Sequence, residues 1–253
     1  MHLKSDDIVR LEIDFITGEL PPPFSHIFKL KLSFSKNFVN TQFDIQYTDR
    51  ENLSPDEIID EGFTMADDYN YKGEIPKLWE SIFKKLYSAS KWSNLKTLGE
   101  KGGIKLLAKD VHGKMIRDIP LNQEDWYFTC QDFIQAIYEI SNREAPMQIR
   151  YLEIKKDKKT VVELVYKFSI RKVVLTVNGK EKEMNWESGR ELASLIFIPD
   201  YDYSLAKEDL PVKNGKYLDC GDGFWHNFEN GIINLDPSFD AKKKIIQSFD
   251  ALI

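Results

Sequence analysis

The sequence contains little cysteine and little histidine. Its 253 residues include two cysteines, Cys130 and Cys220, and four histidines that lie far apart. Two cysteines do not supply the framework of bridges that stabilises small secreted domains, and free thiols are typical of a reducing compartment. A histidine-rich metal site would have to be assembled by the fold. The composition therefore argues against a disulfide scaffold, and we expect a cytoplasmic protein.

Long apolar runs are also absent. No window reaches the length of about 18 apolar residues that a helix needs to span a bilayer. The first residues, "MHLKSDDIVRLEIDF", have neither the apolar segment nor the small-residue cleavage site of a secretory signal. We therefore expect no membrane association.

Positive charge is in the minority. The sequence has 35 Lys and Arg against 41 Asp and Glu, a formal net charge of −6. This balance favours solubility and repels a phosphate backbone, so generic nucleic acid binding is disfavoured. The one dense basic run, "KKDKK" at residues 155–159, interrupts a strand pattern. It predicts a solvated hairpin tip rather than a phosphate-binding patch.

The common catalytic motifs are missing as well. The sequence contains no G-x-x-x-x-G-K-[ST], G-x-G-x-x-G, H-E-x-x-H or G-x-S-x-G pattern and no paired C-x-x-C. These patterns mark phosphate-binding loops, dinucleotide folds, zinc proteases, serine hydrolases and thiol-based sites. None of those classes is supported by a motif.

Alternating polar and apolar residues predict strands in both halves of the chain. A period of two is the pattern of a strand with one buried face. The pair Asn178-Gly179 between two such segments indicates a tight hairpin. We expect antiparallel hairpins and a meander, with strands over 9–15, 26–34, 41–47, 147–156, 160–169, 172–177 and 180–184.

Segments in which apolar residues have helical spacing lie between these groups of strands. The helices are expected over 54–62, 75–87, 123–141, 189–197 and 236–252. The pattern Ser-x-x-Glu predicts a capping box at Ser54 and another at Ser188, and Asp236 or Ser238 can cap the last helix. Because strands follow one another directly, the fold class is α+β, with antiparallel sheets packed against about five helices.

The two halves have similar patterns, since each begins with long strands and continues into helices. We expect a single compact unit over residues 1–253, with the alternative of two similar subdomains at about residues 1–142 and 147–253. The boundary would lie at residues 142–146, where a helical pattern gives way to a strand pattern.

The segment "LDCGDGFWHNFENG" at residues 218–231 is the densest group of chemically active side chains. Its glycines allow tight turns that could present several side chains together. Carboxylate and imidazole groups bind divalent metals. The candidate metal site comprises Asp219, Asp222, His226 and Glu229, the last as a possible base.

The same segment has two other interpretations. Cys220 and His226 could form a pair of thiolate and base. Alternatively, Asp-Gly pairs are ordinary turn formers, and Trp225 then anchors a loop on the core. We expect a turn-rich loop with Trp225 as its buried anchor.

Two acidic segments rich in tyrosine, "DDYNY" (67–71) and "PDYDYS" (199–204), are candidate binding surfaces. Tyrosine provides a large contact area at low entropy cost, and aspartate complements a basic partner. The same side chains could also lie over neighbouring apolar surface as solvated connections. The candidate binding residues are Tyr69, Tyr71, Tyr201, Tyr203, Asp200 and Asp202.

Two functions follow from these observations. The first is a non-catalytic module that binds a protein or another ligand through an acidic surface rich in Tyr and Asp. The alternative is a metal-binding protein or metal-dependent hydrolase that uses residues 219–229. Only this alternative requires a cofactor, a divalent metal.

Overall fold

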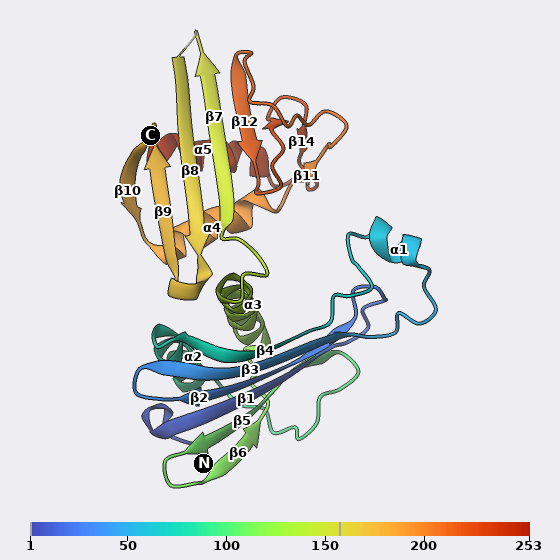
Figure 1. Ribbon diagram of the computed structural model, residues 1–253, viewed down its shortest axis with the longest axis vertical. Helices are drawn as coiled ribbons and strands as arrows, with labels where there is room; N and C mark the ends of the chain where they lie inside the picture. Colours follow the sequence, from blue (N-terminus) through green and yellow to red (C-terminus); the bar gives the residue numbers. More distant parts are fainter. Residues whose placement is uncertain (1, 157) are drawn as a thin grey trace. The chain divides into compact units, whose positions relative to one another are not determined.

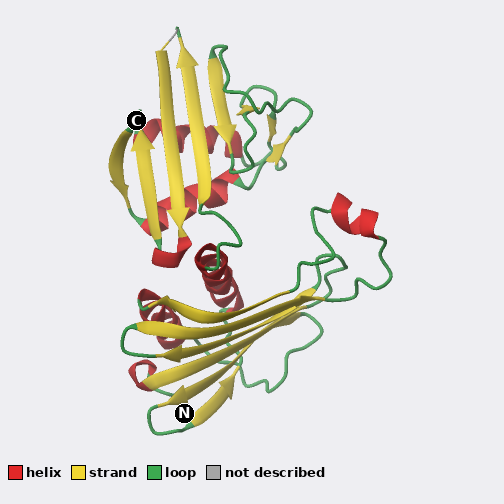
Figure 2. Ribbon diagram, in the orientation of Figure 1, coloured by secondary structure: helices red, strands yellow, loops and turns green. Residues whose placement is uncertain are grey.

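The computed structural model describes residues 2–156 and 158–253, and the chain forms two compact units, residues 1–143 and 144–253. Each unit contains one six-stranded sheet, and every pairing in the two sheets is antiparallel (Figures 1 and 2). The described residues include five α-helices. The predicted α+β class with antiparallel sheets is confirmed.

The first unit has the strand order β4-β3-β2-β1-β5-β6. Its α2 and α3 helices bury aromatic side chains together, and the Trp79 and Phe133 rings lie 5.0 Å apart. On β1, Leu11 and Ile13 are fully buried, as the alternating pattern predicts. Its elements are η1 (Ser5–Asp7), β1 (Ile8–Thr17), β2 (His26–Phe34), β3 (Phe38–Tyr47), α1 (Pro55–Asp60), β4 (Tyr69–Pro76), α2 (Leu78–Ala89), β5 (Gly102–Asp110), β6 (Met115–Asp118) and α3 (Gln123–Ile140).

The second unit has the order β10-β9-β8-β7-β12-β13 and a separate two-stranded pair, β11 and β14. Strands β7 and β8 flank the basic run, whose Asp157 lies outside the described residues. The elements are β7 (Met147–Lys155), β8 (Lys158–Lys167), η2 (Phe168–Ile170), β9 (Lys172–Val177), β10 (Lys180–Met184), α4 (Trp186–Ile196), β11 (Asp200–Tyr201), β12 (Gly215–Asp219), β13 (His226–Asn227), β14 (Ile232–Ile233) and α5 (Ala241–Leu252).

Local signals for turns and caps are confirmed at two places. The Ser54 hydroxyl accepts the Glu57 N–H, and the Glu57 carboxylate accepts the Ser54 N–H in return, which completes the predicted capping box. Asn178 and Gly179 have φ values of 50° and 77° between β9 and β10. Positive φ at both positions is what a tight hairpin turn requires.

Two predicted helix starts are wrong. Helix α4 begins at Trp186, where the side chain of Asn185 accepts the Ser188 N–H at 2.8 Å, so Ser188 lies inside the first turn. Helix α5 begins at Ala241 and is capped by Asp240, whereas Asp236 instead accepts hydrogen bonds from Ser238. Asn and Asp cap helices as well as Ser does, so a Ser-x-x-Glu pattern alone does not fix the first residue.

The two units share one topology. Strands β1 to β4 are followed by α2, β5, β6 and α3 in the first unit, and β7 to β10 are followed by α4, β12, β13 and α5 in the second. Both α2 and α4 carry the triplet Trp-Glu-Ser in their first turn. Trp79 and Trp186, the first residues of these triplets, are both buried.

The correspondence extends to the hairpins that follow β5 and β12. Each strand ends at a buried aspartate, Asp110 or Asp219. One carboxylate oxygen of each accepts backbone N–H groups two and four residues later along the chain. The same side chain therefore stabilises the same turn in both units.

The second unit differs in the length of its connections. The segment from α4 to β12 covers 197–214, whereas the matching segment from α2 to β5 covers 90–101. The segment from β13 to α5 covers 228–240, whereas the one from β6 to α3 covers 119–122. These longer segments contain β11 and β14 and gather beside β12 (Figure 1). Loops held on a rigid framework are where binding residues concentrate.

No helix in residues 2–156 and 158–253 is both long enough and apolar enough to cross a membrane.

Candidate functional site in the loops of the second unit

The hairpin between β12 and β13 brings Cys220, Asp222 and His226 together. One potential ligand atom of each lies within 4.8 Å of the others. Asp222 Oδ2 is 3.1 Å from His226 Nε2 and 3.4 Å from Cys220 Sγ. His226 pairs with Leu218 across the ladder, while Cys220 and Asp222 follow the end of β12. We call these three residues the ligand cluster.

Two tyrosines of the segment 199–204 complete the surroundings of His226. The Tyr203 hydroxyl donates to Asp222 Oδ2 at 2.9 Å, and the Tyr201 hydroxyl donates to the carbonyl of Ile196 at 2.5 Å. Both rings lie edge-on to His226, with centroids at 4.8 and 5.1 Å. The fold therefore brings together the segments 199–204 and 218–231, which are two separate candidates in the sequence.

Burial and charge set the proton states in the ligand cluster. Cys220 is 8% exposed, and burial together with the nearby Asp222 carboxylate raises the pKa of its thiol to about 12. Burial alone would raise the pKa of Asp222, but hydrogen bonds from Phe224 N–H, His226, Tyr203 and Cys220 outweigh it and lower this pKa. A reactive cysteine instead needs an electropositive environment. The geometry does not favour Cys220 as a nucleophile.

His226 occupies an unusual position for a polar side chain. It is fully buried, and its Nε2 contacts Asp222. Its Nδ1 has no hydrogen-bond partner among the residues that the structure describes. A buried polar atom without a partner is rare and needs a specific explanation.

Asp219 lies outside the ligand cluster. Its Oδ1 accepts the N–H groups of Gly221 and Gly223, and its Oδ2 accepts hydrogen bonds from the Arg150 guanidinium, including Nε at 2.8 Å. Both oxygens are therefore engaged in the turn and in an ion pair. Glu229 is exposed, and its N–H donates to Asn227. Of the four predicted metal ligands, the structure brings Asp222 and His226 together, and Cys220 joins them.

Trp225 is a buried residue of the same hairpin. It is 4% exposed and packs with Leu152, Ile154 and Tyr217, while the Arg150 guanidinium lies 5.0 Å from the ring. Its backbone N–H and carbonyl pair with Lys207 at 2.7 and 3.2 Å. Trp225 therefore connects the long segment 197–214 to the sheet.

The other predicted binding residues lie in different surroundings. Tyr69 and Tyr71 belong to β4 of the first unit, where Tyr69 packs against Tyr138 and Tyr71 donates to the Glu74 carbonyl at 3.4 Å. In the second unit, the side chain of Asp200 accepts the Tyr201 N–H, and Asp202 accepts both the N–H and the hydroxyl of Ser204. Asp200 is exposed.

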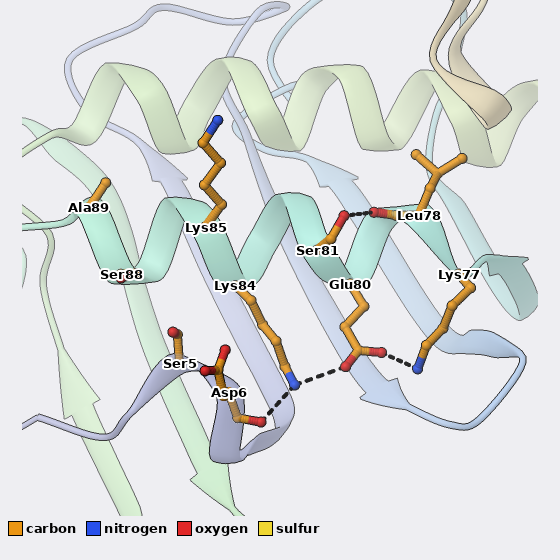
Figure 3. Close-up of a pocket in the computed structure, with 10 residues that line it drawn as sticks. All are labelled: Ser5, Asp6, Lys77, Leu78, Glu80, Ser81, Lys84, Lys85, Ser88 and Ala89. Atoms are coloured by element: carbon orange, nitrogen blue, oxygen red, sulfur yellow. Dashed lines mark hydrogen bonds and ion pairs between the residues drawn. The ribbon is translucent and has the colours of Figure 1, made fainter.

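A groove of about 800 Å³ lies beside α2 and η1 in the first unit (Figure 3). Lys84 donates to the Asp6 carbonyl and pairs with Glu80, which also pairs with Lys77. Lys85 projects away from these ion pairs (Figure 3). The Glu80 carboxylate and two of the three lysines that line the groove, Lys77 and Lys84, are already engaged with one another. A ligand in this groove would have to break these ion pairs to reach most of its charged side chains.

No family model, curated protein or solved structure matches the chain.

Proposed function

We propose that the second unit binds another protein through its long loops. The observation that supports this proposal is a run of exposed apolar side chains along residues 197–235, from 39% exposed at Ile198 to 80% at Val212. Large exposed apolar areas on soluble proteins often mark interaction sites. The side chains that define this loop surface are Phe197, Ile198, Tyr203, Leu205, Leu210, Val212, Ile233 and Leu235.

Charge favours a basic partner. Asp200, Glu208 and Asp209 are exposed among the apolar residues of the loop surface, against two cations in the same segment, Lys207 and Lys213. Complementary charge guides association and excludes wrong partners. We expect the partner to present lysine or arginine around an apolar centre. Because both cysteines are free, we place this interaction in the cytoplasm.

Several contacts hold the loops in place before a partner binds, which lowers the entropy cost of binding. Trp225 and Lys207 pair through their backbones, β11 pairs with β14, and Tyr203 is held by Asp222. A surface that is ordered before binding loses less conformational freedom when the complex forms.

The test compares two triple variants of the whole chain. Leu205, Leu210 and Val212 are changed to serine in the loop variant; the control variant changes Met65, Leu95 and Met115, which are 66%, 66% and 63% exposed in the first unit. Wild type and both variants are immobilised and used to capture partners from the native lysate. The dissociation constant is then measured with the purified partner.

We expect wild type and control to enrich the same partner. The loop variant should keep its melting temperature and raise the dissociation constant at least about tenfold, since contact residues at an interface centre dominate affinity. Binding should also weaken as salt rises. Equal capture by the two triple variants, or no enrichment by wild type, would refute the proposal.

A further inference from the structure

We propose that Cys220, Asp222 and His226 bind a divalent transition metal ion of the zinc class. This inference goes beyond the protein-binding surface and does not depend on it. Thiolate sulfur, imidazole nitrogen and carboxylate oxygen are the three donors that Zn²⁺ uses in proteins. Here they come from one hairpin and are already close together.

The distances fit one ion. Bond lengths of about 2.3 Å to sulfur and about 2.0–2.1 Å to nitrogen or oxygen place tetrahedral ligand atoms roughly 3.2–3.7 Å apart. Asp222 Oδ2 lies 3.1 Å from His226 Nε2 and 3.4 Å from Cys220 Sγ. The three atoms lie within 4.8 Å of one another, so small side-chain movements would bring all of them into contact with one ion.

The burial of His226 is a second, independent observation. The side chain is fully buried, and Nδ1 has no hydrogen-bond partner within the described part of the chain. Leaving a buried polar atom unpaired costs about 1–3 kcal/mol. The protein therefore holds an imidazole with an incomplete set of hydrogen bonds at this position, and Nε2, 3.1 Å from Asp222 Oδ2, is the nitrogen that an ion would bind.

Solvent can reach the ligand cluster at Asp222. The Asp222 side chain is 22% exposed, and Tyr203, whose hydroxyl contacts it, is 59% exposed. Three protein donors leave the fourth position of a tetrahedral ion to solvent. On binding, the S–H bond of Cys220 breaks, its proton passes to solvent, and the thiolate bonds to the ion, so the exchange conserves charge and involves no oxidant.

The test uses the full chain after dialysis against a chelator. Zn²⁺ is titrated by calorimetry, and Co²⁺ is titrated while its absorption spectrum is recorded, because a thiolate bound to Co²⁺ gives a charge-transfer band. The variants are Cys220→Ser and Asp222→Asn. Cys130→Ser is the matched control, since Cys130 is the other buried cysteine and lies in α3 of the first unit.

We expect wild type and Cys130→Ser to bind one ion per chain and to show the charge-transfer band. Cys220→Ser should lose the band, and both cluster variants should weaken Zn²⁺ binding at least about tenfold. Folded wild-type protein that binds no Zn²⁺, or binds Co²⁺ without the band, overturns the site even if a variant fails to fold. No partner protein is present, so this result is independent of the loop-surface experiment.

Discussion

Replacing Trp225 with alanine tests whether this side chain anchors the loops of the second unit. Truncating a large aromatic residue in a core lowers the free energy of unfolding by about 3–5 kcal/mol. Trp225 is 4% exposed, but the cluster that it forms with Leu152, Ile154 and Tyr217 is small. Loss of the contact with the partly exposed Arg150 adds about 0.5–1 kcal/mol. We expect a total near the lower end, about 3 kcal/mol.

The measurements are urea unfolding and thermal unfolding, both followed by circular dichroism, with hydrogen exchange of peptides from residues 144–253 to locate the effect. At about 4 °C per kcal/mol, the melting temperature of the second unit should fall by about 12 °C. Phe224→Ala is the control, because this neighbouring ring is only half-buried and lies 6.0 Å from Tyr203. Its effect should be less than half as large.

A Trp225→Ala protein that melts within about 2 °C of wild type would contradict the anchor assignment. If that protein also lost its partner or its metal ion, Trp225 would belong to a binding site rather than to the core.

The α+β framework could be predicted because its signals are local. Alternation along residues 9–15 and 26–34 places apolar side chains on one face, and the observed pairing of β1 with β2 puts Leu11 opposite Leu32 and Ile13 opposite Leu30. Turn residues such as Asn178-Gly179 indicate a backbone with positive φ from their residue types alone. These features need no knowledge of distant residues.

The shared topology was harder to recognise. The two Trp-Glu-Ser triplets, at 79–81 and 186–188, are visible in the sequence, yet three residues recur by chance. Their meaning depends on the strand order that precedes them and on the matching turns at Asp110 and Asp219. The sequence signal for the shared topology is that each of these triplets follows a group of predicted strands.

The candidate site was only partly predictable, since sequence proximity does not show which oxygen atoms are already engaged. Asp219 and Asp222 look equivalent in the sequence, but Asp219 pairs with Arg150, 69 residues away along the chain. The contacts of Tyr201 and Tyr203 with His226 likewise require the long loop to fold back. Such pairings are determined by tertiary packing.

Two further predictions concern the first unit. Hydrogen bonds from two lysines outweigh the effect of burial and lower the pKa of Glu80, so its stabilising contribution is present above the unfolded pKa of about 4.3 and is lost as the pH falls through the lower folded value. Glu80→Gln should therefore reduce the free energy of unfolding by at most about 1 kcal/mol at pH 7, and a difference from wild type that did not shrink in acid would contradict this assignment. Gly102 has φ +63°, and an added Cβ would lie 2.2 Å from the carbonyl oxygen of Ile16, whereas Gly113, at φ +86°, has open space around it. Both alanine variants suffer the strain of positive φ, about 1 kcal/mol, but only Gly102→Ala also displaces backbone, so it should destabilise by about 2 kcal/mol more in urea unfolding. Equal losses in the two variants would show that the ends of β1 and β5 do not approach this closely.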